Sequence, residues 1–532
     1  MCFYKQVQFL FMLTFLFNFI NGQRRQPNIV FVFADDLGYH DVGYHGSEIK
    51  TPNIDRLSSS GVRLENYYVQ PVCTPTRSQF MTGRYQIHTG LQHGVIRPSQ
   101  ANALPRNSPT IAEKFQEVGY STHAIGKWHL GFYKEKFLPT NRGFDSFYGY
   151  LTGAEDYFDH YRCFDYCGYD LHDNDKNIFN GTGQYSTHLF TEKAIDVIRN
   201  HDQRKPLFLY LSYQAVHSPL QVPRSYIRQY DHFTDKNRRI YAGMVSCLDE
   251  GIGNLTDALK DYDMWDDTVF IFSTDNGGSI EEGGNNWPLR GWKGSLWDGG
   301  MRAVGFICSP LLQYSGNNDH LIHVSDWFLT LIKLAGARKN GTKPIDGYDL
   351  WTTISENAPS PRKELLHNID PRAVKTGRRL YKDSFDNRIR AAIRVGDWKL
   401  ITGDPGNGSW IPPPYIERDL NPGIKYGSNS VWLFSLSDGG SGEPGLSRTP
   451  RHNYIDEGHR KRRHKDAKNI WLFNLREDPF EETDLSPYHL DIVRSLLDRL
   501  AFYEQSSVPC RYPPFDPMSD PQRHGGQWNP WQ

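Results

Sequence analysis

Acidic and amide side chains follow two apolar runs of the sequence and could bind a metal ion. Asp35 and Asp36 come directly after the first run, and Asp275 and Asn276 come shortly after the second. In an open α/β sheet, ligands gather beyond the carboxyl ends of the strands, so we expect these four side chains to lie together. The set offers only oxygen ligands, which suit calcium or magnesium and disfavour zinc. Taken singly, each residue also fits a helix cap or a turn.

A cysteine and an arginine form a second group that could do chemistry. Cys73 opens a C-x-P-x-R pattern that ends at Arg77, within the stretch PVCTPTR, and FMTG follows at 80–83. The residue types alone leave Cys73 open to a plainer interpretation as a thiol in a turn. His217 follows a further apolar run at 206–213, but a lone histidine is more often a satisfied polar residue.

The order of these motifs resembles that of the formylglycine-dependent (type I) sulfatases. The C-x-P-x-R pattern with its FMTG continuation is similar to the sulfatase signature, and GYST with GKWH, at 119–122 and 126–129, is similar to a second one. The motifs ADDLG, HSP, DNGG and RGWK are present in the family's order. The stretches NYYVQPVCTPTRSQ, TGRYQIHTGLQH and GGNNWPLRG place the chain nearest to the arylsulfatase B branch. The resemblance runs from about residue 27 to the C-terminus.

The resemblance implies a nucleophile made by modification and one bound Ca²⁺. Cys73 would be oxidised to formylglycine by a formylglycine-generating enzyme, which is an implied partner during maturation. The ion would be held by Asp35, Asp36, Asp275 and Asn276, together with the modified Cys73. One hydroxyl of the hydrated aldehyde would attack the sulfate sulfur in line, and the sugar oxygen would leave. Asp275 would also help to deprotonate that hydroxyl, and the cation would stabilise charge on the sulfuryl oxygens.

The same resemblance assigns roles to five further residues. Arg77 and Lys127 would fix the formylglycine and its oxygens. His217 and Lys293 would bind the sulfate and protonate the leaving alcohol, because an alkoxide leaves poorly without a proton. His129 would take a proton from the second hydroxyl, which expels sulfate and regenerates the aldehyde. A plain serine or cysteine lacks this second hydroxyl, so its sulfate ester would need attack by water.

The resemblance implies a sulfuric ester hydrolase that acts on aryl sulfates and on sulfated N-acetylgalactosamine of dermatan or chondroitin sulfate. One alternative is another hydrolase of the alkaline phosphatase superfamily that cleaves phosphate or phosphonate esters, against which the intact signature argues. A second alternative is a secreted glycan-binding protein without catalysis. The net charge of −1 gives no overall field that would favour nucleic acid or a membrane.

The elements that must position these residues alternate between strands and helices. The runs Asn28–Ala34, 206–213 and 268–273 are predicted as strands, and 108–118, 189–199 and 240–259 as helices. This alternation predicts a mostly parallel sheet covered by helices on both faces. After about residue 350, the runs 390–401 and 469–475 are typical of antiparallel strands, and 490–503 of a closing helix.

The length of 532 residues exceeds one ordinary core, so we expect two domains. The boundaries expected are a signal peptide at 1–22, a large α/β catalytic domain at 23–350, and a smaller domain with an antiparallel sheet at 351–532. The resemblance implies that this is an alkaline phosphatase-like fold. The stretch 402–466 is predicted to form long surface loops. An insertion at 439–468, which overlaps the end of this stretch, could shape the substrate entrance. The basic run 460–463 could be a protease-processing site or an anion-binding patch, but a solvated charged loop is the plainer interpretation.

Targeting signals point to the secretory pathway, with the lysosome and the extracellular space both left open. Lys5 precedes the apolar run 9–20, and Gly22 offers a cleavage point, as in a signal peptide. No later run is long and apolar enough to span a membrane. Sequons that fit this route begin at Asn180, Asn254, Asn340 and Asn407.

Cysteines are too sparse for a disulfide scaffold, so the fold must depend on its core. Cys163 and Cys167 are close enough in sequence to form a local bridge. Cys247 and Cys308 fall in a helical pattern and at the end of an apolar run, and we expect buried thiols there. Compared with arylsulfatase B relatives, at least two family disulfides are missing, and Cys510 is expected to lack a partner.

Overall fold

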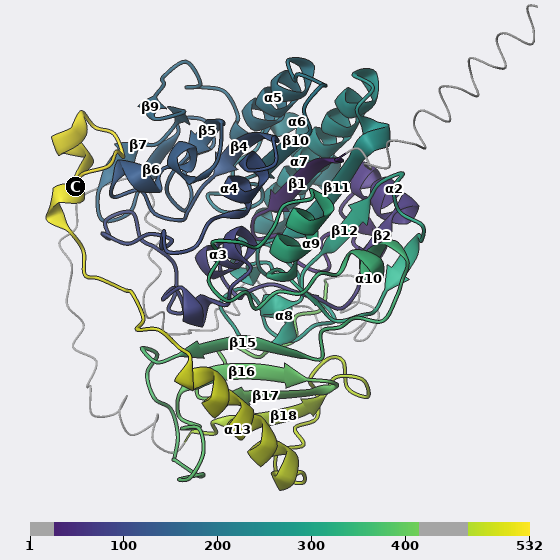
Figure 1. The fold of residues 1–532 in the computed structure, drawn as a ribbon, viewed down its shortest axis with the longest axis vertical. Coiled ribbons are helices and arrows are strands. Elements are labelled where there is room, and N and C mark those ends of the chain that lie inside the picture. Colours follow the sequence, from purple (N-terminus) through teal and green to yellow (C-terminus); the bar gives the residue numbers. More distant parts are fainter. Residues whose placement is uncertain (1–25, 414–466) are drawn as a thin grey trace, which may run out of the picture.

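Two separate β-sheets organise the chain, a large one that carries the helices and a small one beside it (Figure 1). In this computed structural model, residues 26–413 and 467–532 are described. The predicted loop stretch beyond residue 413, the basic run 460–463 and the predicted signal peptide lie outside the described residues. Within the described part, no helix is both long enough and apolar enough to cross a membrane.

The large sheet is mostly parallel at its centre. Its strands run in the order β13 (Gly316–Asn318), β2 (Val62–Leu64), β12 (Gly305–Cys308), β11 (Thr268–Thr274), β1 (Asn28–Ala34), β10 (Leu207–Ser212), β4 (Ser121–Lys127), β5 (Ser146–Tyr150), β8 (His172–Asp173) and β9 (Lys176–Asn177). β1 pairs in parallel with β10 and β11, and the parallel pairing continues through β4 to β5. β12 and β8 run antiparallel to their neighbours. The continuous apolar sequence of β1 fits a strand that is buried on both faces.

Helices cover both faces of this sheet, as predicted. One face carries α2 (Pro52–Ser60), α5 (Ser186–Arg199) and α7 (Lys236–Asp261), and the other carries α3 (Cys73–Thr82), α4 (Ile111–Gln116) and α9 (Asp326–Leu334). Successive side chains of β1 point to opposite faces of the sheet, which gives two separate cores. Val30 and Val32 belong to the first core, whereas Ile29 and Phe31 belong to the second. The prediction of a mostly parallel, doubly covered sheet is therefore confirmed.

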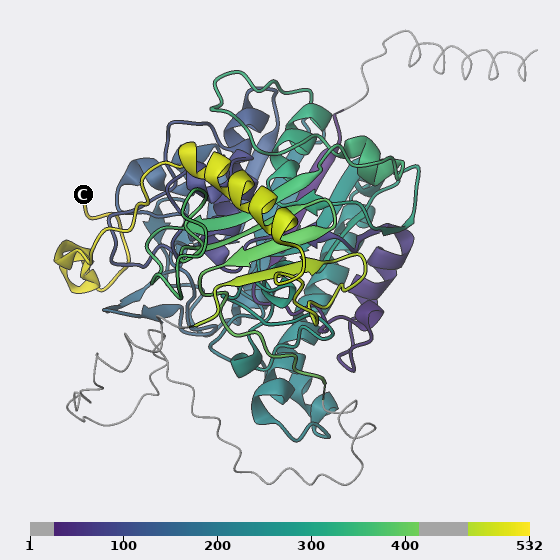
Figure 2. The same cartoon turned by 90° about the horizontal axis from the view of Figure 1, so that it is seen from below.

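The small sheet is antiparallel and lies below the large one in Figure 1. It consists of β15 (Glu364–Asp370), β16 (Arg390–Val395), β17 (Trp398–Thr402) and β18 (Ile470–Asn474). Helix α13 (Leu490–Gln505) crosses its outer face, as Figure 2 shows, and buries Val493, Leu497 and Leu500 in a core of its own. The tail after α13 then returns to a two-stranded sheet at one end of the large sheet, where the backbone amide of Trp528 donates a hydrogen bond to the carbonyl of Tyr169.

Several element boundaries differ from those expected, and two of these differences have a clear local cause. The helix predicted over 108–118 begins only at Ile111, because Thr110 caps it through a reciprocal pair of bonds with Glu113. The run 390–401 is not one strand but the hairpin of β16 and β17, which turns at Gly396 with a φ of 57°.

Short elements complete the described residues. They are α6 (Arg224–Ile227), α8 (Asp298–Met301), α10 (Trp351–Ser355), and the two-stranded pairs β3 (Tyr67–Tyr68) with β14 (Ile322–His323) and β6 (Tyr161–Cys163) with β7 (Cys167–Tyr169). A disulfide joins Cys163 to Cys167 across the second pair. Cys247 and Cys308 are buried free thiols, as predicted, and Cys510 is also free.

Candidate active site

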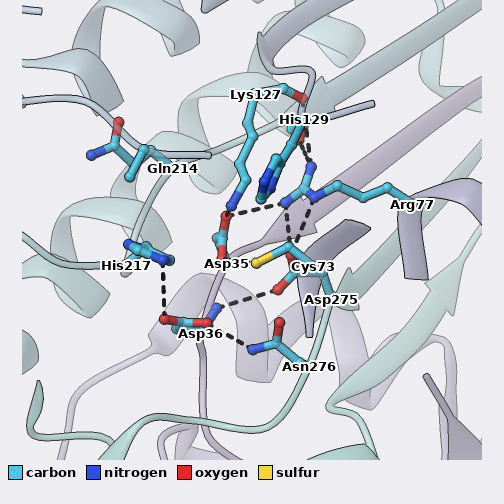
Figure 3. A network of polar contacts seen from close by, with 12 residues as sticks. Asp35, Asp36, Cys73, Arg77, Lys127, His129, Gln214, His217, Asp275 and Asn276 are labelled. Atoms are coloured by element: carbon cyan, nitrogen blue, oxygen red, sulfur yellow. Dashed lines mark hydrogen bonds and ion pairs between the residues drawn. The ribbon is translucent and has the colours of Figure 1, made fainter. Parts of the chain in front are cut away.

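The carboxylates lie at one edge of the large sheet because β1 and β11 are neighbours in register. Ala34 pairs with Thr274, so the residues that follow, Asp35 and Asp275, leave the sheet side by side. Both side chains are fully buried. Asn276 donates to the Oδ1 of Asp36 at 2.7 Å, and the amide of Asp36 donates to Asp275 at 3.4 Å (Figure 3). The structure thus brings together the predicted metal ligands from the two strand ends.

Helix α3 adds Cys73 and Arg77, which lie one turn apart on the same face. The Sγ of Cys73 lies 3.7 Å from Asp35 Oδ1. Burial, followed by the charge of Asp35, raises the pKa of the Cys73 thiol to about 12, so the unmodified side chain is a neutral thiol at physiological pH. Arg77 is fully buried and reaches Asp35 at 3.2 Å and Asp275 at 2.8 Å. Its guanidinium therefore joins both strand ends.

Strand β4 contributes Lys127 at its last position, and His129 follows two residues later. Lys127 forms an ion pair with Asp35. His129 has a φ of 53°, in the left-handed region, and its Nε2 lies 3.1 Å from the carbonyl of Ile96. A carbonyl can only accept, so Nε2 carries the hydrogen and Nδ1 keeps a free lone pair. Burial and the nearby cations lower the pKa of His129 well below its usual value, so the ring is neutral.

His217 and Lys293 both contact Asp36. Lys293 Nζ lies 2.7 Å from Asp36 Oδ2, and His217 Nε2 lies 3.6 Å from the same oxygen. Burial, followed by the charge of Lys293, lowers the pKa of His217. Burial alone would raise the pKa of Asp36, but Lys293 and His217 hold it below its usual value. These two side chains are partly exposed, unlike Arg77 and Lys127, so they border the open side of the site.

The donor set fits a hard divalent cation. The side-chain oxygen of Asn276 is buried and has no hydrogen-bond partner among the described residues. A carbonyl-type oxygen left unpaired beside clustered carboxylates is costly unless a cation binds it. Possible ligand atoms of Asp35, Asp36, Cys73 and His217 also lie within 4.8 Å of one another. The oxygen-rich set matches calcium or magnesium better than zinc.

One residue that contacts the site was missed by the sequence reasoning. Ser212, the last residue of β10, accepts a hydrogen bond from Arg77 Nη1, whereas the side-chain amide of Gln214 points away from the cluster in Figure 3 and donates to the carbonyl of Glu155. The rule that selected Asp35, to look beyond the carboxyl ends of parallel strands, would have found Ser212. Gly153 was not predictable in this way, because it is defined only by its packing against the ring of His129.

A doubly covered α/β sheet with buried carboxylates and cations at its strand ends is typical of an enzyme that processes an anionic ester. The sulfatase family model matches residues 27–337. Arylsulfatase J of Mus musculus is 48% identical over 513 residues, which cover 95% of this chain and 80% of the relative. The chain therefore belongs to the sulfatase family, and this membership supports sulfate ester hydrolysis.

Two further comparisons agree with this assignment. N-acetylgalactosamine-6-sulfatase of Homo sapiens is 28% identical over 356 residues, which cover 63% of this chain and 67% of the relative. The crystal structure of Ps i-CgsB in complex with k-i-k-neocarrahexaose matches with a TM-score of 0.71 and 28% identity, and covers 92% of this chain and 95% of that chain. The placement nearest to the arylsulfatase B branch is not tested by these relatives and stays a prediction.

Proposed function

We propose that this protein removes sulfate from sulfated N-acetylgalactosamine in dermatan or chondroitin chains, and from aryl sulfates, with formylglycine at position 73 and one Ca²⁺. The observation that carries the proposal is the position of Cys73. It begins helix α3 within 3.7 Å of Asp35, at the point where the two strand ends and their cations meet. The similarity to N-acetylgalactosamine-6-sulfatase supports the choice of sugar.

Residues of this chain would orient and activate the reacting groups. Hydrated formylglycine at position 73 supplies a hydroxyl that attacks sulfur. Arg77 and Lys127, held by Asp35, fix residue 73 and offset negative charge beside it. His217 and Lys293 lie on the open side, where they can bind sulfate oxygens and deliver a proton to the leaving alcohol. His129 presents a free Nδ1 to receive a proton from residue 73.

The ion would be held by Asp35, Asp36, Asp275 and Asn276, with residue 73 beside it. Bound there, Ca²⁺ supplies positive charge that polarises the sulfate oxygens. Lys293 now pairs with Asp36, and Arg77 with Asp35 and Asp275. Lys293 and His217 hold the pKa of Asp36 below its usual value, so this carboxylate is ionised, which is the state that binds a cation.

Maturation in the secretory pathway is part of the proposal. The sequon residues Asn180, Asn254 and Asn340 are exposed and Asn407 is half-buried, so a glycan can be accommodated at the first three sites without disturbing the core. Delivery to the lysosome or to the extracellular space follows from the same route.

An assay with matched esters tests the proposal. Protein co-expressed with a formylglycine-generating enzyme is expected to show conversion of Cys73 to the aldehyde by peptide mass spectrometry. It should hydrolyse 4-nitrophenyl sulfate and sulfated N-acetylgalactosamine, but not 4-nitrophenyl phosphate. Cys73→Ala should abolish turnover. Preference for the phosphate ester would favour the phosphoesterase alternative, whereas binding of the sugar without turnover would favour a glycan-binding protein.

A further inference from the structure

Two arginines near the site are left without acidic partners. The guanidinium carbons of Arg97 and Arg162 lie 5.4 Å and 5.6 Å from the ring centroid of the same residue, Phe164. Among the described residues, no carboxylate lies within ion-pair distance of either guanidinium. The Nε of Arg162 is buried and donates to no acceptor in this part of the chain. The charge of Asp170 acts on Arg162 only from beyond ion-pair distance. Two cations on one ring without an ion pair repel each other, and an anion bound between them would relieve that cost.

Both arginines lie close to His129 of the catalytic cluster, Arg97 through its sequence neighbour Ile96 and Arg162 through its charge. Arg97 follows Ile96, whose carbonyl contacts His129 and whose amide donates to Thr74 Oγ1, the residue after Cys73. The charge of Arg162 contributes to the lowered pKa of His129. Arg97 is therefore adjacent in sequence to the residue that contacts His129. The positive charge of Arg162 helps to lower the pKa of the His129 ring.

A second unpartnered polar atom, the hydroxyl of Tyr150, lies within electrostatic reach of Arg162. Tyr150, the last residue of β5, is fully buried, and its hydroxyl has no hydrogen-bond partner among the described residues. Burial, followed by the charges of Asp35 and Glu155, raises the pKa of Tyr150 well above its usual value, whereas Arg77 acts to lower it, so the hydroxyl lies within electrostatic reach of the cluster. A buried donor without a partner is rare in a folded protein unless a ligand or water satisfies it.

The position of Arg162 is rigidly supported. It belongs to β6, which is joined to β7 by the Cys163–Cys167 disulfide, and its carbonyl accepts from Trp528 of the C-terminal tail at 3.0 Å. Figure 1 shows this strand pair and the tail side by side at one end of the large sheet. The contacts that hold the residue are made by backbone and neighbours, so its guanidinium is free to serve a ligand.

Beyond Arg97 the surface continues into a hollow of about 310 Å³. Its lining includes Arg97, Arg372, Tyr512 and Phe515, with one acidic side chain, Asp165. Arginines interleaved with aromatic rings suit a sugar that carries negative groups, because guanidinium forks bind carboxylate or sulfate and rings stack on the sugar faces.

We propose that Arg162 and Arg97 form a subsite for a second anionic group of the saccharide that carries the scissile sulfate. The group is the carboxylate of an adjoining uronic acid or a second sulfate, which share the chemistry that a guanidinium recognises. This inference rests on the proposed function and narrows its substrate class to saccharides with at least two anionic groups. Simple aryl sulfates occupy the catalytic cluster alone and do not reach the subsite.

Steady-state kinetics on four substrates tests the subsite. The substrates are 4-nitrophenyl sulfate, a sulfated N-acetylgalactosamine oligosaccharide with uronic acid, its carboxyl-reduced counterpart, and a disulfated N-acetylgalactosamine. Arg162→Gln is expected to raise KM by about tenfold or more on the substrate whose second anion is recognised, with kcat retained, because one charge-assisted hydrogen bond is lost. Arg97→Gln should act in the same direction, and Arg162→Lys should restore part of the affinity. Arg204→Gln, at an exposed loop position, is the matched control.

The outcomes distinguish a carboxylate from a sulfate as the second anionic group, and a failure of the subsite from a failure of the proposed function. If Arg162→Gln raises KM for the uronate oligosaccharide but not for its carboxyl-reduced form, the recognised group is a carboxylate. If it raises KM for the disulfated sugar, the recognised group is a sulfate. An equal rise in KM for all four substrates, or no rise for any of them, would contradict the proposed subsite. Calorimetry with Cys73→Ala protein measures the affinity for the same saccharides in the absence of turnover, and so tests their binding to Arg162 directly. If wild-type protein hydrolyses no sulfate ester but Arg162→Gln still weakens this binding, the proposed function fails and the subsite stands.

Discussion

Arg77 donates two hydrogen bonds to a single carboxylate oxygen of Asp275, from Nη2 at 2.8 Å and from Nε at 3.2 Å. Because Arg77 also reaches Asp35, one buried guanidinium compensates carboxylates at the ends of two neighbouring strands. The site therefore depends on this residue for its shape as well as for its charge.

Arg77→Met is expected to destabilise the protein and to abolish activity. The substitution leaves two buried carboxylates without their partner, which costs about 3–5 kcal/mol in comparable cases. Thermal and urea unfolding measure the loss. Added Ca²⁺ should reduce the deficit, since the ion neutralises the same carboxylates. Arg199→Met, which removes an exposed ion pair with Asp196, should change stability by less than about 1 kcal/mol. Wild-type stability in Arg77→Met would contradict this account.

Calcium should stabilise the folded protein independently of catalysis. Chelation followed by titration with Ca²⁺ is expected to raise the unfolding temperature, by an amount equivalent to about 2.7 kcal/mol at a hundred times the Kd. Asp36→Asn should lose most of this shift, because it removes one charged ligand next to Asn276. Asp202→Asn, at an exposed loop position, should keep it. A shift that persists in Asp36→Asn would place the ion elsewhere.

The strands and their carboxyl ends were predictable because they depend on local sequence. The apolar run Asn28–Ala34 has the bounds of β1, so the position of Asp35 beyond the end of a strand was predictable. The register that sets Ala34 opposite Thr274 is a finding of the structure. The roles of the catalytic residues came from the resemblance and not from periodicity. Contacts between distant segments were not predictable: the packing of Gly153 on His129 depends on a loop conformation that no pattern encodes.

Gly153→Ala should slow turnover by displacing His129. A Cβ at position 153 would lie 2.8 Å from Cε1 and 2.9 Å from Nε2 of the His129 ring, so the ring must move. A displacement of about 1 Å at a reacting group can cost up to about a hundredfold in rate. We expect kcat to fall by about ten- to a hundredfold, with stability little changed. Gly243→Ala in helix α7 is the control, since its added methyl meets nothing closer than 3.2 Å. Unchanged kcat in Gly153→Ala would mean that His129 is not needed at its present position.

A buried lysine of the small sheet forms ion pairs with two buried carboxylates, one of them in helix α8. Lys399 of β17 lies 2.6 Å from Asp298 of α8 and 2.7 Å from Glu481, and all three side chains are buried. Burial raises the pKa of Glu481 to about 7, against an ordinary value of 4.5. Burial alone would raise the pKa of Asp298 as well, but Lys399 holds it below its usual value. The lysine thus keeps at least one carboxylate ionised between the two sheets.

Lys399→Met should destabilise the protein strongly at neutral pH and less in acid. Without the lysine, both carboxylates face each other in the interior, at a cost of about 3–5 kcal/mol. Their folded-state pKa values then lie above the unfolded ones, so the folded form binds more protons and gains relative stability as the pH falls. The deficit against wild type, measured by urea unfolding, should therefore shrink from pH 8 to pH 5. Lys260→Met, which breaks an exposed pair with Asp257, should show a small deficit that does not change with pH. A deficit in Lys399→Met that grows toward acid would mean that the carboxylates are not buried together in the folded protein.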